Sequence, residues 1–361
     1  MMTFGVRFRV TLFGSSHGPQ VGAIVEGVPA GAPVEVDRMQ SDLDRRRPVG
    51  RRLATRRRES DRLVVDSGIR HGTATGGPIR LHVANEDIRR APYEELAGRP
   101  RPGHADYPAR VRWGPDADLS GGGIFSGRMT VGLVAAGAIA KGLLSSLGIE
   151  VVAFTRSIGG IEDRTSAEAA PDELRRRRDQ HEAGALDPGA AGRMERRIAE
   201  VRRAGDSVGG IIGGRATGLP VGLGEPFFDS VESELAHMLF SIPAVKAVEF
   251  GAGFGVARLR GSQNNDPFCW DPSGRVSTRT NHAGGILGGL STGRPLAFRV
   301  AVKPTASIAR PQETVDLISR TSATIVVKGR HDPCIVPRAV AVVEGATAVV
   351  LADLAMRAGL L

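Results

Sequence analysis

The sequence predicts an α+β protein in which two sheets enclose two pairs of central helices. Three observations favour this fold class: short apolar runs between glycine and proline turns, two long apolar segments of helical length, and a partial repeat along the chain. The runs are typical of antiparallel strands and the long segments of buried helices. With 361 residues, of which 41% are hydrophobic and 24% charged, the chain can bury such a core without cross-links.

The first elements expected along the chain are strands. The apolar runs 22–28, 63–65 and 79–83 are bounded by turn residues, which predicts strands joined in hairpins. The segment 131–147 then predicts a long helix, because it is continuously apolar and rich in alanine and glycine.

A polar stretch from 163 to 206 follows. The four arginines at 175–178 are interpreted as solvated surface, and the Arg/Glu-rich segment 194–203 predicts a solvated helix. A second long apolar helix is expected at 338–357.

The second half of the chain echoes the first. GSSHGPQVGAIV at 14–25 resembles GDSVGGIIGG at 205–214, and SGGGIFSGRMT at 120–130 is echoed by AGGILGGLSTGR at 283–294. We interpret this as two divergent copies of one βαβ-type unit. The boundaries expected are a single domain, 1–361, with halves at approximately 1–160 and 205–361 and a charged helical connection at 161–204.

Cysteine usage and the termini indicate the compartment. Cys269 and Cys334 are far apart in a chain that needs no cross-link, which predicts a reduced, cytoplasmic protein. The first ten residues contain no apolar signal-peptide core, and charged residues interrupt both apolar helices. Neither export nor a membrane span is expected.

Charge favours an anionic ligand. The net charge is +9, and nine arginines lie between 38 and 58 with only Asp42 and Asp44 among them. Only four of the 48 cationic residues are lysines, and the planar arginine fork binds carboxylate and phosphate with two hydrogen bonds. A small phosphorylated or carboxylated ligand is preferred over nucleic acid, because the cluster contains no aromatic residue on which bases could stack.

Several short motifs could carry chemistry. Ser16 and His17 lie in a glycine-flanked turn, although adjacent residues on a strand would point to opposite faces and so disfavour a nucleophile–base pair. Arg101 and His104 flank a Pro-Gly turn that could clamp an anion and supply a proton. The glycine-rich segment 120–128 leads into a helix N-terminus, and 303–307 combines a lysine with two hydroxyls, both of which suit phosphate.

Other site classes are disfavoured. GAGFG at 251–255 departs from the dinucleotide-binding spacing, and no P-loop string occurs. RHDPC at 330–334 cannot alone build a tetrahedral zinc site, so no metal is expected.

Taken together, the motifs resemble those of the chorismate synthase family from residue 8 to about 356. The matching strings are FRVTLFGSSHG, DLDRRRP, TRRRESD, SGIRHGTATGGPI, RPGHADY, GGGIFSGRMT, GDSVGG, SIPAVKAVEFGAGF, GSQNND, NHAGGILGGLSTGRPL, KPTASI and GRHDPCIVPRAVAVVE. The resemblance implies a β-α-β sandwich, with central helices between two antiparallel sheets, and a homotetramer. It also implies a lyase that converts 5-enolpyruvylshikimate 3-phosphate to chorismate and phosphate by anti-1,4-elimination with reduced FMN.

The resemblance further implies roles for individual residues. His17 would protonate the departing phosphate, and His104 would stabilise or protonate the reduced ring near flavin N1. Asp332, with Ser16 as a hydrogen-bond partner, would manage the proton at flavin N5. The substrate or cofactor would be bound by Arg46, Arg52, Arg101, Arg128 and Arg330. The flavin would contact Ile124, Phe125, Ser126, Ala244, Gly288, Lys303, Pro304, Thr305, Ala306 and Ser307, with Arg330 beside it.

Two departures from the family pattern leave alternatives open. Ser15 replaces the usual Glu before the Ser-His pair, and Val49 stands where a glycine usually follows the proline. One alternative is therefore a flavoprotein that has lost the lyase step, and another is a polyanion-binding protein, which the basic charge would favour. Whether NADPH serves as a reductant, directly or through an external flavin reductase, is left open.

Overall fold

Two antiparallel five-stranded sheets form the frame of the protein. This computed structural model describes residues 2–47, 53, 59–88, 98–114, 119–327, 329 and 331–361; Val49, Arg52 and Arg330 lie outside them. The first sheet has the order β1 (Thr3–Phe4), β2 (Arg9–Gly14), β3 (Gln20–Glu26), β7 (Ile79–Ala84), β4 (Val64–Ser67). The second has the order β11 (Val245–Phe250), β16 (Leu296–Val302), β10 (Gly210–Thr217), β8 (Glu150–Ile158), β9 (Ile161–Glu162).

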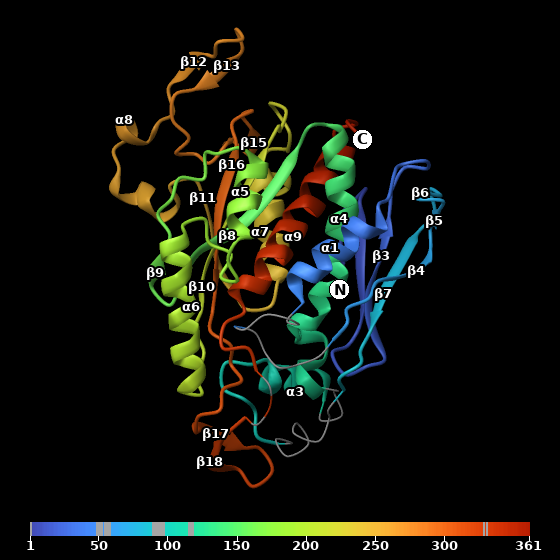
Figure 1. Ribbon diagram of the computed structural model, residues 1–361, viewed down its shortest axis with the longest axis vertical. Helices are drawn as coiled ribbons and strands as arrows, with labels where there is room; N and C mark the ends of the chain where they lie inside the picture. The colour runs from blue at the N-terminus through green and yellow to red at the C-terminus, as the bar shows by residue number, and fades with distance from the viewer. Residues whose placement is uncertain are drawn as a thin grey trace.

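Helices fill the space between the sheets (Figure 1). The central four are α1 (Val36–Arg46), α4 (Thr130–Ser146), α7 (Val231–Ser241) and α9 (Val336–Arg357). Helix α4 packs on β2, β3 and β7, whereas α9 packs on β8 and β10 and also against α4. A Cβ on Gly137 would lie only 2.3 Å from Gly345 Cα, so glycine in both helices permits this close approach.

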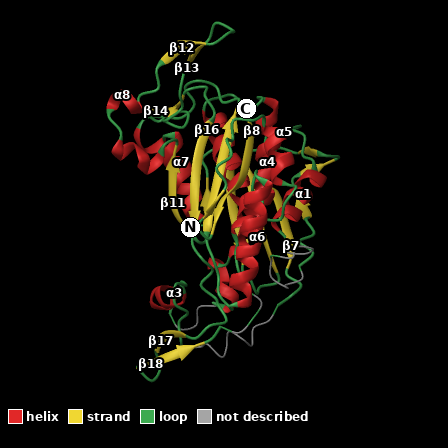
Figure 2. Cartoon of the chain, turned by 60° about the vertical axis from the view of Figure 1, so that its left-hand side comes forward, coloured by secondary structure: helices red, strands yellow, loops and turns green. Residues whose placement is uncertain are grey.

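The remaining elements lie outside these layers. On the outer side of the second sheet, α5 (Pro171–Arg178) contacts β8, and α6 (Pro188–Arg203) contacts β8 and β9. The smaller elements are α3 (Asp106–Trp113), α8 (Gly261–Asn264), the short helical turns η1 (Ser120–Phe125), η2 (Gly127–Met129), η3 (Phe227–Asp229) and η4 (Gly253–Arg258), and the strand pairs β5 (Ile69–Arg70) with β6 (Thr73–Ala74), β12 (Phe268–Trp270) with β13 (Val276–Thr278), β14 (Ile286–Leu287) with β15 (Leu290–Ser291), and β17 (Gln312–Asp316) with β18 (Thr321–Ile325). Figure 2 shows β12–β13 and β17–β18 at opposite ends of the molecule.

The predicted α+β sandwich with central helices between two antiparallel sheets is confirmed. The two strings aligned at 14–25 and 205–214 contribute β3 and β10, each the middle strand of its sheet. The second echo differs in structure, because 120–130 leads into a helix whereas 283–294 forms a hairpin that leads into β16. The halves at 1–160 and 205–361 stay a prediction; β8, from the first of them, pairs with β10 in the second sheet.

The interpretation of the arginines at 175–178 and of the helix at 194–203 as solvated is wrong at individual residues. Arg178 is 4% exposed because its guanidinium reaches the buried Glu344, and Met194 and Ile198 of α6 are fully buried against the core. Both long apolar helical segments, 127–146 and 336–357, are long enough to cross a membrane. However, 72% and 94% of their most apolar windows are buried inside the fold, as expected for core helices.

Candidate active site

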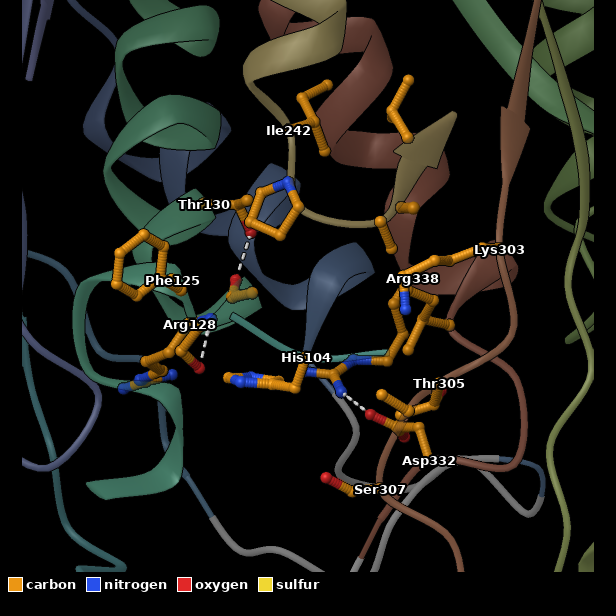
Figure 3. Close-up of a pocket in the computed structure, with 18 of the residues that line it drawn as sticks. His104, Phe125, Arg128, Thr130, Ile242, Lys303, Thr305, Ser307, Asp332 and Arg338 are labelled. Carbon is orange, nitrogen blue, oxygen red and sulfur yellow. Dashed lines mark hydrogen bonds and ion pairs between the residues drawn. The ribbon is translucent and has the colours of Figure 1, made fainter. Parts of the chain in front are cut away.

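A cavity of about 600 Å³ opens where the ends of the central helices meet. It is lined by the C-terminal ends of α1 and α7, the N-terminal ends of α4 and α9, and the loops around 101–105 and 303–307. Figure 3 shows Arg128 and Thr130 on one side, Arg338, Asp332 and Lys303 on the other, and His104 between them. Both halves of the chain therefore build this cavity.

Arg46, at the last turn of α1, is held in the cavity wall by three acceptors. Its Nε donates to Thr130 Oγ1 at 3.0 Å, its Nη2 to the Gly127 carbonyl at 2.8 Å and its Nη1 to Asp61 Oδ2 at 3.3 Å. Burial lowers the pKa of Arg46 to about 9, with Asp61 opposing the shift and Arg338 and Arg128 adding to it. Arg46 is therefore a cation at neutral pH.

Arg128 lies beside Arg46 and shares the same carboxylate. Its Nε donates to Asn85 Oδ1 at 2.8 Å, its Nη2 to the Ala84 carbonyl at 3.2 Å and its Nη1 to Asp61 Oδ1. Asp61 is fully buried. Burial alone would raise the pKa of Asp61, but the charges of Arg46 and Arg128 hold it below its usual range.

Arg101 and His104 share a second carboxylate, that of Asp106. Arg101 donates from Nε and Nη2 to the two Asp106 oxygens, both at 2.7 Å. His104 Nδ1 lies 2.7 Å from Asp106 Oδ1, so Nδ1 carries a proton and Nε2 is left for other partners. Burial would raise the pKa of Asp106, but hydrogen bonds from Arg101 and His104 hold it below the usual range.

The second half of the chain anchors this loop. Arg101 Nη1 donates to Ser307 Oγ at 3.3 Å, and Lys303 Nζ donates to the Gly103 carbonyl at 3.0 Å. The β17–β18 hairpin holds the preceding segment, since Leu317 N donates to the Gly98 carbonyl at 2.8 Å and Thr314 Oγ1 to the Pro100 carbonyl at 2.6 Å.

A run of three glycines brings the two predicted catalytic histidines to one loop. Gly121, Gly122 and Gly123 have φ values of 59°, 95° and 53°, which glycine adopts without strain. A Cβ on Gly121 would lie 2.0 Å from His17 Cε1, and one on Gly122 would lie 3.2 Å from His104 Nε2. Glycine is thus required at Gly121 for His17 to pack there.

The expectation that Ser16 and His17 point apart is wrong. The two residues lie in a turn after β2, not in a strand, and Ser16 Oγ is 3.1 Å from His17 Nδ1. Ser16 Oγ also donates to the Ser120 carbonyl at 2.9 Å, which ties the turn to the glycine loop. Both residues are buried, and His17 lies behind Gly121, which lines the cavity.

Asp332 faces the cavity from the segment before α9. It forms an ion pair with Arg338 Nη1, as Figure 3 shows, and Arg338 Nε donates to the Arg46 carbonyl at 2.9 Å. Arg338 therefore connects the predicted proton-handling carboxylate to the end of α1. The bond predicted between Asp332 and Ser16 stays a prediction.

Of the predicted flavin contacts that the structure describes, all but Gly288 line the cavity; Arg330 lies outside the described residues. Those present are Ile124, Phe125, Ser126, Ala244 and the run Lys303, Pro304, Thr305, Ala306 and Ser307. Gly288 lies in the β14–β15 turn, next to Gly289, whose carbonyl accepts from Val231 N at the start of α7. The cavity lies at the other end of that helix, so the described chain does not bring Gly288 to it.

Sequence reasoning missed several cavity residues. Glu59, Lys246, His331 and Arg338 line the cavity, and Asp61 and Asp106 hold its arginines from behind. Most of these residues lie inside the strings TRRRESD, RPGHADY and GRHDPCIVPRAVAVVE. For the acids Glu59, Asp61 and Asp106, a carboxylate close to arginine in the sequence is the feature that could have identified them. Among the described residues, six cationic side chains face the cavity against two carboxylates, Glu59 and Asp332.

A second cavity, of about 540 Å³, lies on the other side of α1 and the start of α9. Arg45 and Arg178 line it together with Asp44, Asp179 and Glu182, so its described cations do not exceed its acids. Within the described ranges, no group of three or more His, Cys, Asp or Glu side chains could hold a metal ion.

Comparisons with known proteins agree over almost the whole chain. The family model described as chorismate synthase matches residues 8–356. Curated chorismate synthases from Dehalococcoides mccartyi and Korarchaeum cryptofilum are 48% and 49% identical over 99% and 98% of this chain, and 98% and 97% of their own. A crystal structure of chorismate synthase superposes with a TM-score of 0.78 at 28% identity, over 98% of this chain and 93% of that one.

Proposed function

Because the chain belongs to the chorismate synthase family, we propose that the 600 Å³ cavity is the active site in which this reaction takes place. The protein is a lyase that converts 5-enolpyruvylshikimate 3-phosphate to chorismate and phosphate, the last step of the shikimate pathway.

One observation carries the placement of the site. Three buried guanidinium groups, those of Arg46, Arg101 and Arg128, converge on one cavity with an excess of cations over carboxylates. The substrate has two carboxylates and a phosphate, which are the groups that guanidinium forks bind best. The second cavity, whose described carboxylates outnumber its arginines, lacks this match.

The residues present also fit a reduced flavin mononucleotide. Ile124, Phe125 and Ala244 offer apolar surface, while the 303–307 segment contributes an ammonium and hydroxyl groups. Within the described chain neither Lys303 nor Lys246 has a carboxylate partner; burial, with the Lys246 charge adding to it, lowers the pKa of Lys303. Two lysines at one edge of the cavity suit a phosphate group. When bound, reduced FMN supplies electron density to the allylic system of the substrate.

The residues of this chain then bind, orient and move protons. Arg46, Arg101 and Arg128 would hold the anionic groups in fixed positions, which favours the transition state because little reorganisation is needed. His17, whose Nδ1–H donates to Ser16 Oγ, would act as an imidazolium that gives its Nε2 proton to the departing phosphate and is left as the neutral imidazole. His104 Nε2 and the Asp332 carboxylate would hold protons toward the ring, with Asp106 fixing the tautomer of His104.

The test is anaerobic phosphate release from 5-enolpyruvylshikimate 3-phosphate, with photoreduced FMN present or absent. We expect release only with reduced FMN, and His17→Ala should lower turnover far more than it lowers flavin affinity. His104→Ala should in addition change the absorption spectrum of bound flavin. Near wild-type turnover in both variants would contradict these roles.

Further properties follow from the family resemblance and are proposed on that ground. These are a cytoplasmic location, a homotetramer, and reduction of the flavin either with NADPH by this enzyme or by an external flavin reductase. Light scattering measures the assembly, and phosphate release with NADPH and oxidised FMN separates the two routes of reduction.

A further inference from the structure

We propose that Asp61 is a positioning residue for substrate binding: it holds the Arg46 and Arg128 guanidinium groups side by side with their remaining N–H groups toward the cavity. The inference rests on the proposed function, because it takes this cavity to be the place where the anionic substrate binds. Asp61 is fully buried behind the wall that the two arginines form.

The hydrogen bonds define what each arginine can still offer. A guanidinium has five N–H groups, and each of these two gives three to acceptors in the described chain. Among the described residues, two N–H groups therefore remain on each without a hydrogen-bond acceptor, and Arg128 Nη2 also lies 3.6 Å from the Glu59 carboxylate. Because Arg46 and Arg128 are 4% and 6% exposed and both line the cavity, we place those donors on the cavity side.

A shared carboxylate is what allows two such cations to lie together. Two guanidinium groups withdrawn from water repel each other, and Arg338 adds a third positive charge nearby. Asp61 accepts from both arginines, one on each oxygen. Glu59, 3.6 Å from Arg128 Nη2, contributes a second negative charge on that arginine alone.

The backbone explains how Asp61 reaches this place. Its φ is 47°, in the left-handed region, which Asp and Asn enter more readily than most residues. Gln40 in α1 fixes the turn, because its Nε2 donates to the Asp61 carbonyl at 3.2 Å and its Oε1 accepts from Leu63 N at 2.9 Å. The helix that carries Arg46 thus also holds the carboxylate that orients it.

The first experiment uses Asp61→Asn, which keeps the side-chain shape and the backbone preference but removes the charge. We expect the substrate KM to rise at least 10-fold, kcat to change less than 3-fold, and FMN affinity, measured by fluorescence, to stay the same. The matched control is Asp163→Asn. Asp163 is 1% exposed and accepts from Leu186 N and Asp187 N in the α5–α6 connection.

The control separates positioning from folding. An unchanged KM in Asp61→Asn, or an equal rise in Asp163→Asn, would overturn the inference. Calorimetry of substrate binding in the presence of oxidised FMN tests the role of Asp61 separately from the proposed reaction. Wild-type protein that binds substrate but releases no phosphate with reduced FMN contradicts the proposed reaction, whereas equal Kd values for wild type and Asp61→Asn contradict the role of Asp61.

A second experiment tests the same inference even if Asp61→Asn does not fold. Arg46→Lys, Arg128→Lys and the double variant form a cycle that measures whether the two guanidinium groups act as one unit. We expect the double variant to lose at least 10-fold less affinity than the product of the single losses. Losses that simply multiply would overturn the inference, because they would show two independent cations.

Discussion

The two cavities on either side of α1 differ in charge although they are similar in size. Neighbouring residues divide between them: Arg46 and Arg338 line the larger cavity, while Arg45 and Pro337 line the smaller. In the larger, cations outnumber acids among the described residues, and the shared Asp61 leaves donors on its arginines. Next to the smaller cavity, three cationic side chains surround a single buried carboxylate.

That acid is Glu344, which is 1% exposed. Its Oε1 accepts from Arg45 Nη2 at 2.6 Å and Lys141 Nζ at 3.0 Å, and its Oε2 from Arg178 Nη1 at 2.7 Å and Ala153 N at 3.1 Å. These contacts to Glu344 join α1, α4, α5, β8 and α9. A buried arginine alone therefore does not mark an anion site, whereas an excess of cations over carboxylates among the described lining residues does.

The largest expected effect is on stability, from removing the Glu344 charge. Glu344→Gln leaves the buried Arg178 and the partly exposed Arg45 and Lys141 without their common partner, which should cost about 3–5 kcal/mol of unfolding free energy. The fraction that stays folded should keep its kcat/KM within threefold, because Glu344 and its cationic partners hold helices together and do not line the larger cavity. Denaturant unfolding and steady-state kinetics measure the two effects.

Acid provides a control for this variant. Burial would raise the pKa of Glu344, but Arg45, Lys141 and Arg178 hold it well below its ordinary value. The carboxylate therefore stabilises the fold above the ordinary glutamate pKa of about 4.3, and this stabilisation is lost as pH falls through the lowered value. The gap between wild type and Glu344→Gln should narrow on acidification; a gap that widened would contradict the assignment.

The next largest effect is expected on activity, and it compares the adjacent residues Arg46 and Arg45, which line different cavities. Arg46→Lys keeps the charge but loses the fork, so kcat/KM should fall about 100-fold, or ~2.7 kcal/mol at 1.36 kcal/mol per tenfold. Arg45→Lys, the matched control one position away, should change kcat/KM less than threefold. Equal losses would show that both cavities take part in the reaction.

A smaller effect is expected from the carboxylate behind His104. Asp106→Asn weakens the hold on His104 Nδ1 and Arg101, so kcat should fall about 30-fold, or ~2 kcal/mol, and the pH–rate profile should shift. The control is Asp66→Asn, which removes the charge from the Asp66–His82 pair, also with a short contact of 2.9 Å but partly exposed. A profile that does not move in Asp106→Asn would remove Asp106 from the site.

The smallest effect is expected on the surface. Arg176 is 63% exposed and pairs with Glu173 within α5, whereas Arg178, two residues on, is buried against Glu344. Arg176→Ala should therefore change the unfolding free energy by about 0.5 kcal/mol or less, in line with exposed ion pairs. Thermal unfolding of Arg176→Ala and Arg178→Ala side by side measures the difference; equal shifts would contradict the burial of Arg178.

Periodicity accounts for what the sequence could predict of the fold. The apolar runs predicted β3, β4 and β7 and the helices α4 and α9 to within a few residues, because burial imposes those patterns. Periodicity could not place β8, since a strand that is buried on both faces carries no alternating pattern that would show which sheet it joins. Nor could charge density show that Arg178 turns inward, because its partner Glu344 is far away in the sequence.

The candidate site was predictable at the level of motifs, and less so at the level of contacts. Arg46, Arg101, Arg128, His104 and Asp332 all line one cavity, as the resemblance led us to expect of a shared site, whereas the roles of these residues stay predictions. Asp61 was not found, because its pairing depends on a left-handed turn that no apolar pattern encodes. The contact between Ser16 and His17 was missed because a turn was treated as a strand.

The β17–β18 hairpin has a consequence for the order in which the enzyme is made. It holds the segment before Arg101 through bonds that span more than 200 residues, including Thr314 to Pro100. During synthesis, the N-terminal half leaves the ribosome long before this hairpin exists. The loop that carries Arg101 and His104 therefore acquires these anchors only when nearly the whole chain has emerged, and in an unfinished chain this wall of the larger cavity lacks them.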